Sequence, residues 1–149
     1  MKAARVVSVT LIISICCYGQ NHAASRNIDK SVAALIEKMV DKKTEQRAFA
    51  DLEALGCQAV PAIIGRMDDR RDLPDPNIAL TNKSPDAFEN QRYYGPKKVV
   101  DVLDAILDQI TGRFGSIVNG ATDAERTDAI REWRDFLRKT PRAKLCEAG

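Results

Sequence analysis

The chain has 149 residues, and its 23 Lys and Arg nearly balance its 21 Asp and Glu, which leaves a formal net charge of +2 at pH 7. This length suits one domain with one hydrophobic core, and the balanced charge lacks the basic stripe typical of nucleic-acid binding. The single histidine, His22, lies at the end of a segment that we expect to be removed. Most hydrolase designs are therefore excluded, because they need a Ser-His-Asp or Cys-His pair or an imidazole ligand for zinc.

Residues 1–24 have the pattern of a secretory signal peptide. A short basic start ending at Arg5 precedes an apolar run from Val6 to Cys17, which is too short to span a bilayer comfortably. We expect cleavage after Ala23 or Ala24, and hence a periplasmic or secreted protein.

Two alternatives to simple cleavage stay open. Cys16 and Cys17 close the apolar run, so one of them could be lipid-modified and anchor the chain in the envelope. The match to a bacterial lipobox is partial, because Ile15 or Cys16 stands where that motif has Gly, Ala or Ser. A retained transmembrane anchor is the other alternative, and the short apolar run disfavours it.

The mature chain opens with amphipathic helical patterns. A first helix is predicted from Asp29 to Lys42, and a helical hairpin follows, with an apolar seam formed by Phe49, Leu52, Leu55, Val60, Ile63, Ile64 and Met67. Thr44 is placed to cap the first helix of the hairpin, and Gly56 can end it in the left-handed conformation. Pro61 fits the first turn of the second helix.

The residues Ala54-Leu55-Gly56, followed by Ala59-Val60-Pro61-Ala62-Ile63-Ile64, resemble a HEAT-type helical hairpin. The resemblance implies a helical stack whose surface binds other proteins, and it implies no chemistry. An unrelated pair of helices is the alternative reading.

Residues 68–96 form a long insertion with four prolines and no sustained apolar stripe. We expect residues 77–81 to be briefly extended, and residues 85–91 to form one or two helical turns that hold Phe88 against the body. The acidic residues near Asp68 match no calcium loop, and Arg70 and Arg71 lie between them, so we expect a solvated charged turn and no metal site.

Tyr93 and Tyr94 close this insertion. Because exposed tyrosines often mark contact surfaces, we predict that Tyr93, Tyr94 and Phe88 bind a partner protein. The alternative is that the two tyrosine rings cover the end of the helical stack.

Two more helices are predicted after the insertion. The first spans 96–111, and we expect Asp101, Asp104 and Asp108 on its solvent side, in preference to a catalytic carboxylate cluster. The second opens at residue 122 with a Thr-x-x-Glu capping box and stops before Pro141, with Trp133 on its inner face.

The segment from Tyr94 to Leu107, continued by 110–112, 114–115, 119–120 and Glu132-Trp133-Arg134, resembles the end of small exported bacterial HEAT-repeat proteins of unassigned function. Residues 111–115 are one residue shorter than the form typical of those proteins. The resemblance implies a fold and no activity.

Cys57 and Cys146 remain after signal removal. In an exported chain they permit a disulfide. Equally, Cys57 could pack as a small apolar residue and Cys146 could stay free or pair with another molecule.

The sequence therefore predicts an all-α, HEAT-like right-handed stack of about five helices. Residues 1–24 are the signal peptide, and residues 25–149 form one domain with an insertion at 68–96 and a tail at 141–149. The expected function is a non-catalytic interaction module of the bacterial envelope that binds another protein, with no cofactor, metal, nucleic acid or membrane span after processing. The alternatives are an immunity-type inhibitor of a periplasmic toxin and, less favoured, an enzyme that works without histidine.

Overall fold

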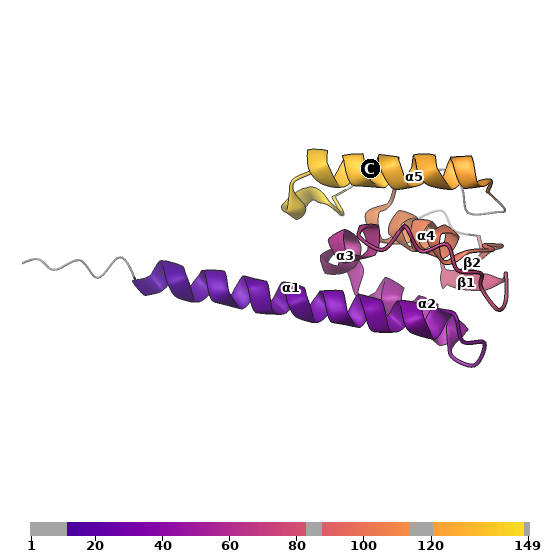
Figure 1. Ribbon diagram of the computed structural model, residues 1–149, viewed down its shortest axis with the longest axis horizontal. Helices are drawn as coiled ribbons and strands as arrows, with labels where there is room; N and C mark the ends of the chain where they lie inside the picture. The colour runs from indigo at the N-terminus through magenta and orange to yellow at the C-terminus, as the bar shows by residue number, and fades with distance from the viewer. Residues whose placement is uncertain (1–11, 83–87, 114–120, 148–149) are drawn as a thin grey trace, which may run out of the picture.

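The structure is a computed structural model that describes residues 12–82, 88–113 and 121–147, with side chains from residue 24 onward. Five α-helices lie in this part of the chain: α1 (Ile12–Met39), α2 (Glu45–Ala54), α3 (Val60–Ile64), α4 (Val99–Thr111) and α5 (Asp123–Lys139). Two short 3-10 helices follow α2 and α5, at Gly56–Ala59 and Arg142–Lys144. The expectation of a chain built only from helices is wrong, because the insertion contains a hairpin of β1 (Ile78–Thr81) and β2 (Gln91–Tyr94) (Figure 1).

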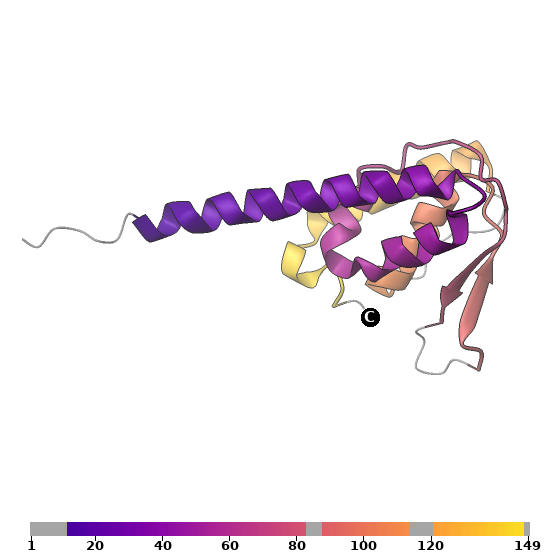
Figure 2. The same ribbon diagram turned by 90° about the horizontal axis from the view of Figure 1, so that it is seen from below.

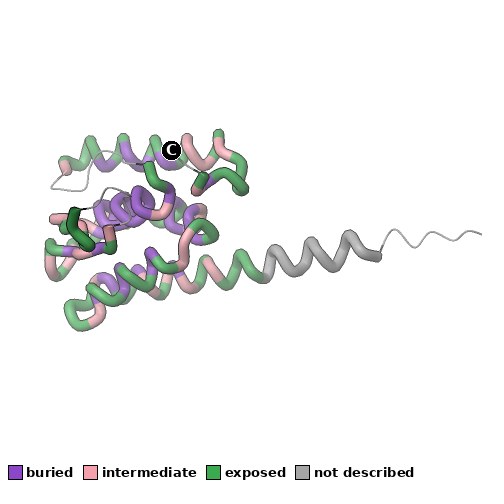
Figure 3. Tube along the Cα trace, turned by 180° about the vertical axis from the view of Figure 1, so that it is seen from behind, coloured by how far each residue is buried: buried purple, intermediate pink, exposed green. Residues whose placement is uncertain are grey.

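The helices pack in layers around α4. Figure 1 shows α1 and α2 along one side, α3 and α4 in the middle and α5 across the other side. α4 has buried residues on all its faces, which Figure 3 shows as purple along the central helix. One continuous apolar cluster runs from Val32 in α1 to Leu145 in the tail. The broad apolar face predicted for this helix explains its central place, because it can be covered from several directions.

Several helix boundaries after α1 coincide with capping and turn signals in the sequence. Gly56 and Gly112 have φ of 64° and 68°, the left-handed conformation that ends a helix without steric cost. Pro61 lies in the first turn of α3. Thr122 caps α5 by accepting from the backbone N–H of Glu125, whose side chain accepts from the N–H of Thr122.

The first helix differs from its predicted limits. α1 runs from Ile12 to Met39 instead of starting at Asp29, so it continues through the expected cleavage positions, and its first half extends beyond the rest of the molecule (Figures 1 and 2). Thr44 stands at the start of α2 without capping it, since its hydroxyl donates to the Lys38 carbonyl at 2.8 Å. None of the helices in the described ranges combines the length and hydrophobicity that crossing a membrane requires.

The three aspartates of α4 correct another expectation. Asp101, Asp104 and Asp108 are 0%, 1% and 3% exposed, so they do not form a solvent side of the helix. The reason is that α4 is covered on every face, and its carboxylates must find donors inside the protein.

Candidate protein-binding surface

The β-hairpin is anchored to the helical body by one of its faces. Ile78 and Leu80 on β1 are almost fully buried, and β1 packs beside α2. On β2, Tyr94 is half-buried, and its hydroxyl accepts a hydrogen bond from Nε2 of Gln109 on α4 at 2.7 Å. Alternating burial is what a strand with one face on a core produces. The hairpin is therefore held in place by apolar packing and a polar contact.

The opposite face of the hairpin is open to solvent. Tyr93 is 71% exposed and Phe88, just before β2, is 104% exposed; these are the large hydrophobic side chains of the described chain that are left uncovered. The Tyr93 hydroxyl donates to Oε1 of Gln91, two residues earlier on the same face, at 3.0 Å. This contact orients the ring across the outer face and leaves most of it in water.

The three residues predicted to bind a partner are thus divided by the structure. Tyr93 lies on the outer face and Phe88 is exposed in the bend before β2, whereas Tyr94 faces the body and anchors the hairpin. The expectation that Phe88 packs on the body is wrong, because the chain from Phe88 to Asn90 forms a bend that leads into β2. The first part of the helical turn predicted for 85–91 lies outside the described residues, and Gln91 belongs to β2.

The approach to the hairpin is tied to the start of α4. The backbone N–H of Leu73 donates to the Lys97 carbonyl, and the N–H of Val99 donates to the Arg71 carbonyl, both at 2.9 Å. These bonds satisfy backbone groups at a helix start that would otherwise lack partners. The segment of the insertion before β1 is consequently attached to the start of α4.

Arg71 holds this segment to α1. Its two Nη atoms donate to the two carboxylate oxygens of Glu37 at 2.8 and 2.9 Å, and it also bonds Asp69. The hydrogen bonds from Arg71 lower the pKa of Glu37. Burial raises the pKa of Asp69, but the hydrogen bonds and charge of Arg71 outweigh it, so that the net shift is downward. The charged turn predicted here is an ion-pair network.

No set of three His, Cys, Asp or Glu side chains within the described ranges is grouped so that it could hold a metal ion.

The buried carboxylates of α4 are used to join α4 to α5. Asp101 accepts from Nε and Nη2 of Arg126 at 2.6 and 2.9 Å, and it also accepts from the backbone N–H groups of Lys97 and Lys98. These hydrogen bonds with Asp101 raise the pKa of Arg126. One helical turn later, the indole N–H of Trp133 donates to Oδ1 of Asp104 at 2.6 Å. Buried groups with such partners stabilise a helix interface and are poorly placed to meet a substrate.

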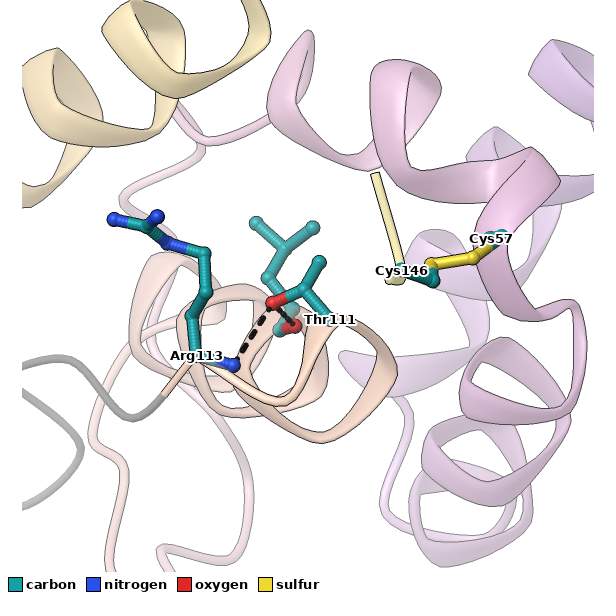
Figure 4. The surroundings of a disulfide bond; sticks show 5 residues. Cys57, Thr111, Arg113 and Cys146 are labelled. Atoms are coloured by element: carbon teal, nitrogen blue, oxygen red, sulfur yellow. Dashed lines mark hydrogen bonds between the residues drawn. A yellow bond between two sulfur atoms is a disulfide. The ribbon is translucent and has the colours of Figure 1, made fainter. Parts of the chain in front are cut away.

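Cys57 and Cys146 are joined in a disulfide, with their Cα atoms 6.0 Å apart (Figure 4). The bond links the turn after α2 to the tail, across 89 residues of sequence. A pocket of about 530 Å³ lies next to Cys57, between residues 24–29 of α1 and the tail. Its lining is mixed and includes Ile28, Asp29, Pro61 and Arg142.

Cys16 and Cys17 lie within α1, in the stretch whose side chains are outside the described residues. Their proposed lipid modification stays a prediction.

Comparison of the chain with models of known protein families, with curated proteins and with solved structures found no match.

Sequence reasoning missed three residues that shape the site. Gln91 orients the exposed tyrosine, Gln109 fixes the anchoring one, and Arg126 pairs with a buried aspartate. Arg126 could have been found, because it lies four residues before Ile130 and seven before Trp133, on the inner stripe of α5. The two glutamines carry no such signal, since their roles depend on pairings between distant segments.

Proposed function

We propose that this chain is a non-catalytic protein-binding module of the bacterial cell envelope, and that the outer face of its β-hairpin is the partner surface. The observation that carries the proposal is the exposure of Tyr93 and Phe88 on a hairpin that projects from the helical body (Figure 2). Aromatic side chains are enriched at protein interfaces, and tyrosine is among the residues that most often anchor them.

The anchoring of the hairpin supports this interpretation. Ile78, Leu80 and Tyr94 already attach the inner face of the hairpin to the body. The ring of Tyr93 is therefore not needed to hold the strands in place. A preformed surface also costs less conformational entropy on binding than a loop that must be ordered.

The envelope location rests on the signal-like residues 1–24 and on the disulfide, because disulfides persist in oxidising compartments. The finer description of the fold, a HEAT-like stack, is part of the proposal and rests on the helical hairpin around Gly56. The hairpin inserted before α4 gives that stack a binding surface of its own.

The proposal is tested with the double variant Tyr93→Ala and Phe88→Ala. Purified wild type and variant are used to recover partners from native envelope extract, with Glu132→Ala, at an exposed position of α5, as the control. Truncating interface anchors costs about 2 kcal/mol or more, so we expect the affinity for the partner to fall by at least about 30-fold and its recovery to fall with it. The control should recover the same partner as the wild type.

Circular dichroism separates binding from folding in this experiment. The double variant should keep the helicity and melting temperature of the wild type. If it melts much earlier and binds normally per folded molecule, the two rings stabilise the fold and the partner surface lies elsewhere. Recovery of one toxin in stoichiometric amount would identify the partner as the target of an immunity-type inhibitor.

A further inference from the structure

The pairing of β1 with β2 determines which backbone groups of β2 are already used. The Asn82 N–H donates to the Asn90 carbonyl at 2.9 Å, in the same register that pairs Ile78 with Tyr94. Residues along an antiparallel pair alternate between hydrogen-bonded and non-hydrogen-bonded positions. Arg92 and Tyr94 therefore direct their backbone N–H and C=O groups toward β1.

It follows that Gln91 and Tyr93 direct their backbone groups away from β1. Within the described ranges, no hydrogen bond uses the backbone N–H or C=O of either residue. Figure 2 shows β2 on the side of the hairpin that is farther from the helices. β2 also contains no proline or lysine, the residues that commonly protect a strand edge from pairing.

We propose that an extended segment of the partner protein adds to β2 as a third strand. Its backbone bonds to Gln91 and Tyr93, and it carries an aliphatic side chain opposite Tyr93. Residues opposite each other in a sheet share a face, so this side chain lies on the exposed face and covers the tyrosine ring. The inference rests on the proposed function and specifies how the partner is recognised.

The partner strand belongs to another protein and not to a second copy of this chain. The two-fold register that pairs both Gln91 and Tyr93 within β2 bonds Gln91 of each copy to Tyr93 of the other, and it places Arg92 directly opposite Arg92. The neighbouring two-fold registers pair Gln91 with Gln91 or Tyr93 with Tyr93, and each needs a residue outside β2 to bond the other position. Like charges at directly opposed positions destabilise strand pairing. A foreign strand can place a neutral or acidic residue there instead.

The first experiment measures amide hydrogen exchange of β2, residue by residue, in the full chain. A hexapeptide of alternating Thr and Val is joined to the C-terminus through a flexible Gly/Ser linker of about 30 residues, which spans about 30 Å on average and supplies an effective concentration in the millimolar range. The same peptide is also added free at millimolar concentration, so that the result does not depend on the reach of the linker. A matched control peptide has prolines in place of two valines and cannot complete the ladder.

Strand addition predicts that exchange at the Gln91 and Tyr93 amides slows by about tenfold or more with the Thr/Val peptide. The Arg92 amide, which already bonds to β1, should change less, and the proline peptide should have no effect. Unchanged exchange at Gln91 and Tyr93 with both the linked and the free peptide overturns the inference. Slowing by the proline peptide as well would also overturn it.

Sedimentation equilibrium of the wild type tests the choice of partner. A monomer is expected across the micromolar range. A dimer that Arg92→Glu strengthens or weakens would identify β2 as a contact between copies, and would overturn the assignment to a foreign strand.

The two proposals fail in different ways. If Tyr93→Ala with Phe88→Ala abolishes partner recovery while the β2 amides stay unprotected in the complex, the surface is used through its side chains alone. In that case the proposed function stands and strand addition is wrong.

Discussion

Charged side chains are buried at the interface between α4 and α5, whereas an aromatic side chain is exposed on the outer face of the β-hairpin. At the interface, the carboxylates of Asp101 and Asp104 are buried and receive hydrogen bonds from Arg126 and Trp133. On the hairpin, the ring of Tyr93 is left in water. The polarity of a side chain therefore does not decide whether it is buried in this protein. A side chain is buried where a neighbouring element supplies its contacts. A buried charge needs donors from a neighbouring element, and α5 supplies them.

Removing Trp133 should break the interface most severely. Trp133→Ala removes a large ring from the inner face of α5 and also the N–H donor to Asp104, so we expect a loss near the top of the range of about 3 to 5 kcal/mol. Trp133→Phe keeps an aromatic ring but loses the N–H donor and part of the indole volume, for an expected cost of about 1 to 3 kcal/mol. Urea unfolding followed by circular dichroism measures both. A change below about 1 kcal/mol for the alanine variant would contradict the buried position of the ring.

Arg126→Ala tests the ion pair at the same interface. The variant leaves the Asp101 carboxylate buried without its guanidinium, and breaking a buried pair in this way costs about 3 to 5 kcal/mol. The matched control is Arg134→Ala, on the same helix, whose partner Asp68 is solvent-exposed; its expected cost is about 1 kcal/mol or less. Equal losses of stability in the two variants would show that the buried ion pair contributes no more to the free energy of unfolding than the exposed one.

Glu45 sharpens the comparison because it is a buried carboxylate with a weaker donor. Burial raises its pKa, and the backbone N–H of Asp75, 3.3 Å from Oε1, only partly opposes this. The folded chain therefore holds the proton more tightly than the unfolded chain, and stability falls as pH rises from the ordinary value of 4.5 through the raised pKa. Glu45→Gln removes this loss. The melting temperature of the variant relative to the wild type should be higher at pH 7 than at pH 4, and a pH-independent difference would refute the shift.

The hairpin should show the smallest effect on stability. Tyr93→Phe removes the hydroxyl that donates to Gln91 at an exposed site, so the free energy of unfolding should change by no more than about 0.5 kcal/mol. Tyr94→Phe is the matched variant on the inner face, and loss of its hydrogen bond with Gln109 should cost about 1 kcal/mol. Chemical denaturation of the two variants side by side measures the contrast. Equal costs of about 1 kcal/mol would mean that the hydroxyls of both tyrosines stabilise the fold.

Local signals in the sequence determined much of the helical framework. Glycine at the left-handed positions 56 and 112, proline in the first turn of α3 and the capping box at Thr122 each act within a few residues of themselves. The apolar stripes around them predicted which faces would be buried, and the expected extended stretch near residue 78 is β1. Such features need no knowledge of distant segments, since backbone geometry and period alone define them.

Only the tertiary structure decided which of the polar and aromatic side chains are buried and which are exposed. Asp101 and Asp104 were expected in water. They are buried because α5 packs on α4 and places Arg126 next to Asp101 and the indole of Trp133 next to Asp104. Tyr93 and Tyr94 are adjacent in sequence and alike in chemistry, and they point to opposite faces because the strand is extended. Which of the two faces the body follows from the pairing of β2 with β1 and the packing of β1 on α2. In both cases the deciding contact joins segments far apart in the chain. No local pattern records such a contact, because its free energy exists only when the two segments meet.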